Sequence, residues 1–157
     1  MTSDQVVRQQ LLALLNGGNA HMTFEQAVAD FPAEHFNTRP LNIPYTPWHI
    51  LEHLRIAQWD ILDFIRNPDY ITPEWPKEYW PDPEAIAHQK QWDKTINSFL
   101  ENLQSLRDIV SDPETDLYAP IPHAPDYNIF REMLVVSDHN AYHIGEFAIL
   151  RQVMSTW

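Results

Sequence analysis

Apolar residues recur at three- and four-residue steps along most of the chain, which is the period of a helix with one buried face. The pattern is clearest between residues 48 and 67, in Ile50, Leu54, Ala57, Ile61, Phe64 and Ile65. It returns between residues 126 and 157, in Ile129, Met133, Val136, Ile144, Phe147 and Met154, and more weakly between residues 84 and 112. No run of alternating apolar and polar residues indicates a sheet.

Prolines separate these helical segments. All 13 fall in three clusters, at residues 32–47, 68–83 and 113–125. Because proline lacks an N–H group and clashes inside a helix, the clusters mark the connections between helices. The four proline-free segments are 1–31, 48–67, 84–112 and 126–157.

These segments predict an all-α fold, a four-helix bundle with long proline-rich connecting loops and with neighbouring helices antiparallel. A chain of 157 residues suits one domain over residues 1–157. Thr46 and Pro47 suit the N-cap and first turn of the second helix. In the first segment, Gly17 and Gly18 either kink one helix or split it in two. The aromatic-rich loop 68–83 is expected to pack on the bundle as a lid.

Charge and composition exclude several classes of function. The chain carries 10 Lys and Arg against 22 Asp and Glu, a net charge of −12, which disfavours nucleic-acid and anionic-membrane partners. No apolar run is long enough to span a membrane, and the first residues lack the basic region of a secretory signal, so we expect a cytoplasmic protein. Since the chain has no cysteine, any metal ion must be held by histidines and carboxylates.

Two histidine pairs carry the candidate chemistry. His49 and His53, and likewise His139 and His143, are spaced four residues apart, which places both rings of a pair on one helix face. Stepping each helix by about 100° per residue puts His143 about 60° and His139 about 100° from the centre of the apolar stripe. His53 lies about 80° from the centre of its own stripe, and His49 about 120°.

The helix angles therefore favour a metal site built from His53, His139 and His143, with a coordination position left open, as in catalytic sites. Ordinary interior histidines with routine hydrogen bonds are the competing interpretation, and residue spacing alone does not separate the two. Three imidazoles suit zinc, nickel, copper or iron, with zinc or nickel our first expectation.

Several polar residues could support such a site. Asp60, Asp138 and Glu146 are candidates for orienting a ligand ring by accepting its second N–H group, although surface carboxylates are common. If the chemistry is hydrolysis, it requires a general base, and His123 and Glu146 are the candidate catalytic residues. His123 lies among the prolines before the last helix, where a solvent-exposed turn histidine is the alternative.

Residues 48–54 (WHILEHL) and 138–145 (DHNAYHIG) resemble the DinB-like superfamily, which includes the YfiT-like proteins. This group consists of small bacterial four-helix proteins with a three-histidine metal site. The resemblance covers nearly the whole chain and implies that the metal ligands are His53, His139 and His143. The family commonly has arginine after the last ligand, where this chain has Ile144, so no residue at this position can take the role of that arginine.

Members of this superfamily include S-transferases that use low-molecular-weight thiols and a maleylpyruvate isomerase, while others are described only as metal-dependent hydrolases. The resemblance implies a divalent-metal-dependent enzyme that activates water or an exogenous thiol and acts on a small-molecule substrate. The alternative is a non-catalytic, stress-related bundle that binds metal or a partner protein. Family members are often dimers, and Leu51 and Leu62, which lie outside the apolar stripes, could form a homodimer face.

Overall fold

The computed structural model describes residues 2–157, which form an all-α bundle with one short β-hairpin, so the predicted fold class is confirmed. The elements are α1 (Ser3–Asn16), α2 (Phe24–Val28), α3 (Pro47–Arg66), α4 (Gln89–Ser111), β1 (Pro120–Ile121), β2 (Ala124–Asn128) and α5 (Ile129–Val153). A single 3-10 turn covers Ala33–His35. None of these helices is long and apolar enough to cross a membrane.

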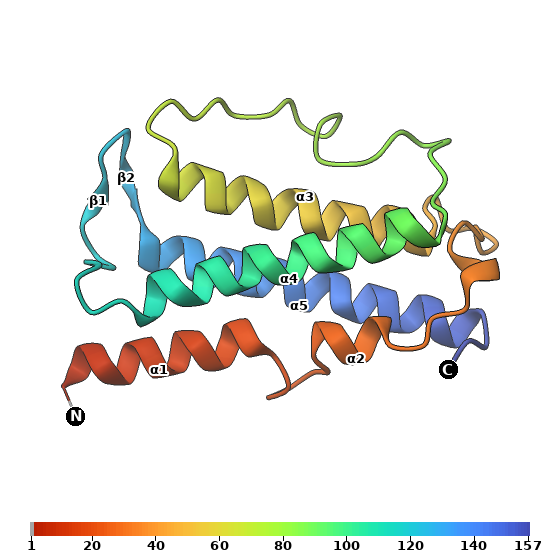
Figure 1. Ribbon diagram of the computed structural model, residues 1–157, viewed down its shortest axis with the longest axis horizontal. Coiled ribbons are helices and arrows are strands. Elements are labelled where there is room, and N and C mark those ends of the chain that lie inside the picture. Colours follow the sequence, from red (N-terminus) through yellow and green to blue (C-terminus); the bar gives the residue numbers. More distant parts are fainter. Residues whose placement is uncertain (1) are drawn as a thin grey trace.

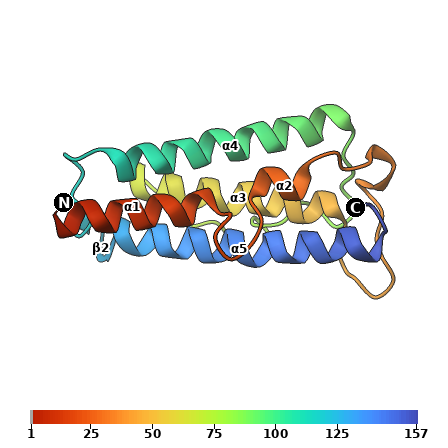
Figure 2. The ribbon, with the colours of Figure 1, turned by 90° about the horizontal axis from the view of Figure 1, so that it is seen from below.

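The helices lie side by side along one axis, and α1 and α2 share one position of the bundle, as Figures 1 and 2 show. The helix of the first segment is split rather than kinked, because Gly17 and Gly18 adopt φ angles of 68° and 78°. Residues with a side chain rarely adopt such angles, so the glycine pair ends α1. Thr23 then starts α2 by accepting a hydrogen bond from the Gln26 amide.

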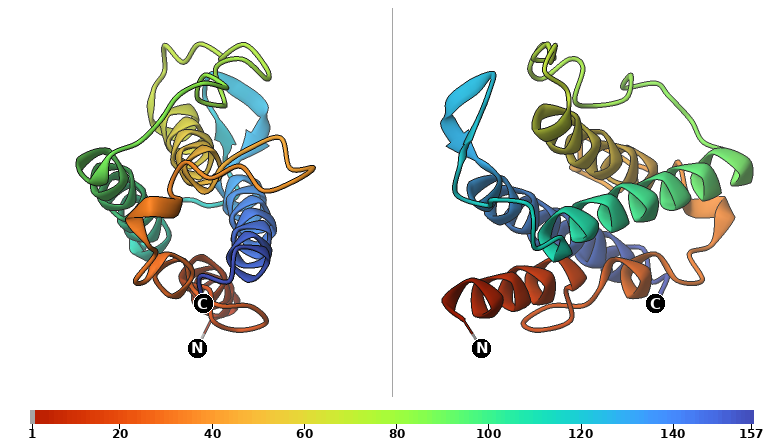
Figure 3. Two further views of the ribbon diagram at one scale, coloured as in Figure 1. Left: turned by 90° about the vertical axis from the view of Figure 1, so that its right-hand side faces the viewer. Right: turned by 60° about the vertical axis from the view of Figure 1, so that its left-hand side comes forward.

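The prediction that neighbouring helices are antiparallel is wrong for α3 and α4, which run in the same direction (Figure 1). The connection between them, residues 67–88, therefore travels back along the whole bundle before α4 begins. Figure 3 shows this connection on the opposite side of the bundle from α1. The length of the proline-rich loop is what permits a parallel pair.

The expectation of no strands is also wrong in detail. Strands β1 and β2 form an antiparallel hairpin in which Pro120 pairs with Asn128 and Ile121 with Ala124. The strands are two and five residues long and contain prolines, so they are too short to show an alternating pattern.

The core is formed by the buried faces of all the helices, with aromatic stacking at its centre. The rings of Phe24 and Phe99 stack at 3.9 Å between centroids, and those of Phe36 and Trp92 at 4.0 Å. Thr46 caps α3 as predicted, by accepting a hydrogen bond from the His49 amide.

The leucines proposed for a homodimer face belong to this core. Leu51 is 0% exposed and Leu62 is 7% exposed, so that part of the prediction is wrong. Both side chains pack against other helices of the same chain because α3 lies between α4 and α5 and contacts both. The homodimer itself stays a prediction.

Candidate metal centre

The structure brings three histidines from two helices to one point, as the helix angles predicted. His53 lies in the middle of α3, and His139 and His143 lie one turn apart in the middle of α5. The Nε2 atom of His53 is 3.1 Å from that of His143 and 3.1 Å from that of His139. One nitrogen from each of the three rings lies within 4.8 Å of the others, a grouping able to hold a metal ion.

His53 is held by the connection between α3 and α4. Its Nδ1–H group donates a 2.7 Å hydrogen bond to the carbonyl oxygen of Tyr79. The ring of Trp80 lies flat against the His53 ring, with 3.8 Å between centroids and 4° between planes. The aromatic-rich loop thus packs on the bundle as predicted, and it also fixes the orientation of a candidate ligand.

The same loop is anchored by a buried carboxylate. Asp60 accepts hydrogen bonds of 2.8 Å from the hydroxyl groups of both Tyr70 and Tyr79. Asp60 therefore acts on His53 only indirectly, through the segment that carries the Tyr79 carbonyl. Of the two other carboxylates predicted to orient a ring, Asp138 is exposed and makes no hydrogen bond to a histidine of the group.

His143 is oriented by Glu146, one turn further along α5. Its Nδ1–H group donates to Glu146 Oε2 at 2.7 Å, and the other carboxylate oxygen accepts a 3.2 Å hydrogen bond from the Tyr45 hydroxyl. Both oxygens of Glu146 are thus engaged. The Tyr142 ring packs edge-on against His143 at 4.9 Å, and the nearby Glu146 raises the pKa of Tyr142.

These hydrogen bonds determine where the ring protons are. Because Nδ1 of both His53 and His143 donates its proton to an oxygen, Nε2 of each neutral ring is a bare acceptor. When both rings are neutral, two bare acceptors therefore face each other at 3.1 Å. Such an arrangement is repulsive unless a cation lies between the two nitrogens.

The chemistry of the donors fits a divalent metal ion. Burial lowers the pKa of His53 to about 4 and that of His139 to about 3, so both rings are neutral near pH 7. Neutral imidazole is the form that binds metals. Around a tetrahedral zinc ion, with bonds of about 2.1 Å, two ligand nitrogens are about 3.4 Å apart, close to the separation of His53 and His143.

His49 does not join the group, although it is also buried, with 3% of its surface exposed. Its Nδ1 atom accepts a hydrogen bond from the Thr46 amide, and its Nε2–H group donates to the Ala85 carbonyl at 3.1 Å. Both ring nitrogens are therefore used at the start of α3. The pairwise spacing of His49 and His53 reflects a helix cap followed by a candidate ligand.

His123 lies away from the three histidines, in the turn of the hairpin. Its ring packs against Phe64, with 5.5 Å between centroids. Since Phe64 is 11 residues beyond His53 on the same helix, it lies about 16 Å further along the helix axis. The structure therefore does not bring His123 to the position expected of a catalytic acid or base.

The sequence alone did not indicate the main-chain carbonyl of Tyr79 as a partner of His53, because main-chain groups leave no residue-type signal. Trp80 and Tyr45 were identifiable only as members of aromatic and proline-rich loops. These two side chains stack at 5.8 Å beside the site, next to a pocket of about 210 Å³ lined by Pro44, His49, Pro81 and Pro83.

Comparison with known proteins gives one finding about the family. The family model of the DinB superfamily matches residues 18–147, a span that includes all three histidines and Glu146. No curated protein and no solved structure matches the chain.

Proposed function

The chain belongs to the DinB superfamily, and from this membership and the three-histidine group we propose that it is a divalent-metal-dependent enzyme. His53, His139 and His143 would hold the ion, which we expect to be zinc or nickel. The observation that carries the proposal is the convergence of three ring nitrogens, in which Nε2 of His53 lies 3.1 Å from Nε2 of His143 and 3.1 Å from Nε2 of His139.

The ligand count supports catalysis over storage. No fourth histidine, cysteine or carboxylate joins the group within residues 2–157. Catalytic metal sites keep a coordination position open, whereas structural sites are closed by a fourth protein ligand. A divalent ion bound here would lower the pKa of a coordinated water or thiol toward neutrality.

The surrounding side chains favour thiol transfer over hydrolysis as the first reaction to test. Both oxygens of Glu146 are engaged, so we assign this residue to orienting His143, and His123 lies at the hairpin. A base-assisted attack by water therefore has no free protein base among these candidates. A thiol depends less on a base, because its unperturbed pKa of about 8.5 is far below the value of about 15.7 for bulk water and a bound metal ion lowers it further. Because the chain has no cysteine, the thiol would come from a low-molecular-weight cosubstrate.

Tyr142 is the group best placed to contact a substrate. Its side chain is 64% exposed, and its ring packs edge-on against His143. Since the ordinary pKa of a tyrosine is about 10, the hydroxyl group is protonated near pH 7 and can donate a hydrogen bond to a substrate oxygen.

The proposal is tested with protein purified without an affinity tag. We expect about one zinc or nickel ion per chain, sharply reduced in His53→Ala, His139→Ala and His143→Ala and retained in His49→Ala. The metal-loaded protein is then assayed for transfer of small thiols and for hydrolysis.

A folded protein that stays metal-free after incubation with zinc and nickel would make the histidines structural and remove the proposal. Metal retention without turnover in either assay would instead support the non-catalytic alternative.

A further inference from the structure

The third histidine of the group lacks the partner that the other two have. Nδ1 of His53 and Nδ1 of His143 each donate to an oxygen at 2.7 Å. Nδ1 of His139 is buried and has no hydrogen-bond partner. The next residue, Asn140, has a buried side-chain oxygen, Oδ1, which also has no partner. Buried polar atoms are rarely left unpaired, so two of them on neighbouring residues require an explanation.

Asn140 is held in place by a chain of buried amides. Its Nδ2 group donates a 2.9 Å hydrogen bond to Gln58 Oε1, and Gln58 Nε2 donates a 2.7 Å hydrogen bond to the carbonyl oxygen of Phe99. Gln58 is 0% exposed and Asn140 is 8% exposed. These two hydrogen bonds link the backbone of α4 to Asn140 through Gln58 of α3. Because Nδ2 of Asn140 donates to Gln58, the atom of Asn140 that has no partner is its oxygen Oδ1, an acceptor.

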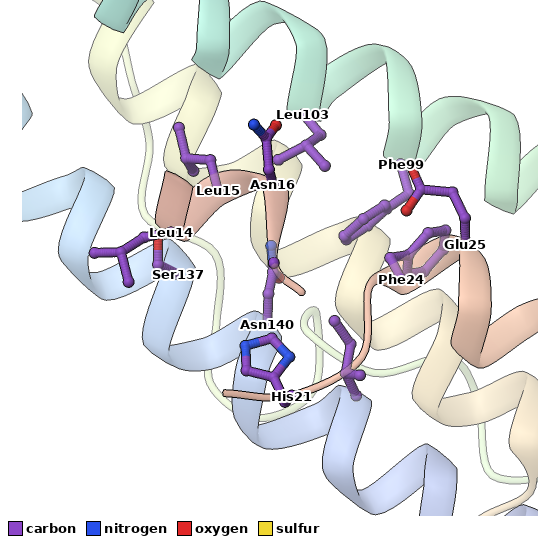
Figure 4. A pocket seen from close by; sticks show the side chains of 12 residues that line it. Leu14, Leu15, Asn16, His21, Phe24, Glu25, Phe99, Leu103, Ser137 and Asn140 are labelled. Carbon is purple, nitrogen blue, oxygen red and sulfur yellow. The ribbon is translucent and has the colours of Figure 1, made fainter. Parts of the chain in front are cut away.

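Space is available on one side of the Asn140 amide. Figure 4 shows this side chain pointing from α5 into a small cavity that Ser137 and His21 also line. The cavity has a volume of about 20 Å³, enough for about one water molecule. The Asn140 side chain therefore lines this cavity, while its Nδ2 group keeps the amide anchored to Gln58.

We propose that Asn140 is a positioning residue of the metal centre, whose Oδ1 accepts the Nδ1–H group of His139 and leaves Nε2 of that ring as a bare lone pair. Metal-ligating histidines commonly donate their second N–H group in this way, which fixes the tautomer of the ring. The two atoms are both buried, lie on consecutive residues of α5 and have no other partner, so this bond would pair both of them.

The tautomer of His139 decides whether the site is ready for a metal ion. If the proton were on Nε2, His139 would donate it to His53 Nε2, 3.1 Å away, and a ring-to-ring hydrogen bond would occupy the position of the ion. With the proton on Nδ1, all three Nε2 atoms present lone pairs to one point. The metal-binding part of this inference rests on the proposed function, but the position of the proton does not.

The direct test needs no substitution. In metal-free, ¹⁵N-labelled protein near pH 7, NMR of the histidine rings distinguishes the two neutral tautomers. We expect His139 to carry its proton on Nδ1, and a proton on Nε2 would overturn the inference. A protein that binds no zinc would contradict the proposed function, whereas the tautomer would still decide this inference.

Substitutions test the effect on metal binding. Asn140→Leu has a similar shape but no acceptor, so we expect the His139 proton to move to Nε2 and the zinc affinity to fall by roughly 10- to 100-fold. Asn140→Asp restores an acceptor and is expected to restore the Nδ1 tautomer. Ser137→Ala is the matched control, because Ser137 lines the same cavity but donates only to the Met133 carbonyl, and it should change neither property.

An Asn140→Leu protein that keeps both the Nδ1 proton and the zinc affinity of the parent would overturn the inference. If this variant does not fold, the tautomers of the unmodified protein and of Asn140→Asp decide the question.

Discussion

Replacing Glu146 with alanine tests how strongly the carboxylate supports the proposed metal ligand His143. The substitution removes the 2.7 Å hydrogen bond from His143 Nδ1–H and also frees the Tyr45 hydroxyl. The carboxylate is mostly buried, with 23% of the side chain exposed. The ring would lose both its orientation and the negative charge that makes its Nε2 atom a stronger electron-pair donor.

The magnitude follows from the kind of bond that is lost. A hydrogen bond to a charged group contributes about 1.5–3 kcal/mol, and every 1.4 kcal/mol corresponds to about a tenfold change in an equilibrium constant. We therefore expect Glu146→Ala to weaken zinc binding by roughly 10- to 100-fold. Glu146→Gln keeps an oxygen acceptor but not the charge, and its loss should be about fivefold, since neutral hydrogen bonds contribute about 1 kcal/mol less.

The assay is a competitive titration in which a chromophoric chelator and the protein share a limiting amount of zinc. Asp138→Asn is the matched control, because Asp138 is an exposed carboxylate on the same helix, beside His139. It removes the same charge from the chain without removing a contact to a ring. Equal losses of zinc affinity in Glu146→Ala and Asp138→Asn would refute the reasoning, because they would show that the loss of one negative charge, and not of the hydrogen bond to His143, weakens binding.

Three further predictions concern folding stability. Phe99→Ala removes a ring that is 1% exposed and stacked on Phe24, so urea unfolding should show a loss of about 3–5 kcal/mol. Gly17→Ala should destabilise the protein by about 1–3 kcal/mol because of the φ angle of 68°. Gly145→Ala lies inside α5 with nothing within 4 Å of the added Cβ, and it should stabilise the protein by up to about 1 kcal/mol. Changes of the same sign in the Tm of the two variants would contradict this. Burial lowers the pKa of His53 to about 4 and that of His139 to about 3, below the 6.5 of a histidine in the unfolded chain, so the unfolded state takes up more protons as the pH falls. The metal-free protein should therefore have its full free energy of unfolding above about pH 6.5 and lose part of it progressively toward pH 4. A urea midpoint unchanged between about pH 7 and pH 5 would contradict this.

The sequence predicted the parts of the fold and site that depend on periodicity. Apolar spacing located the three long helices, and the same helix angles brought His53, His139 and His143 together without reference to any partner. Thr46 was predictable because its capping bond is made within four residues of sequence. These features are local, or follow from which face of a helix is buried.

Features that depend on how distant segments meet were not predictable. The parallel course of α3 and α4 depends on the path of the long connection, and that path also brings the Tyr79 carbonyl to His53. Leu51 lies outside the apolar stripe of its helix but is 0% exposed, because α3 has neighbours on more than one side. His49 is buried for a similar reason, since the same connection places the Ala85 carbonyl against its ring.

The most direct test of the metal centre is an anomalous-difference map from crystals of zinc-loaded protein, with data collected at the zinc absorption edge. We predict one strong peak per chain, about 2.1 Å from the Nε2 atoms of His53, His139 and His143. A map with no peak among these three nitrogens, or with its strongest peak at another histidine, would contradict the account.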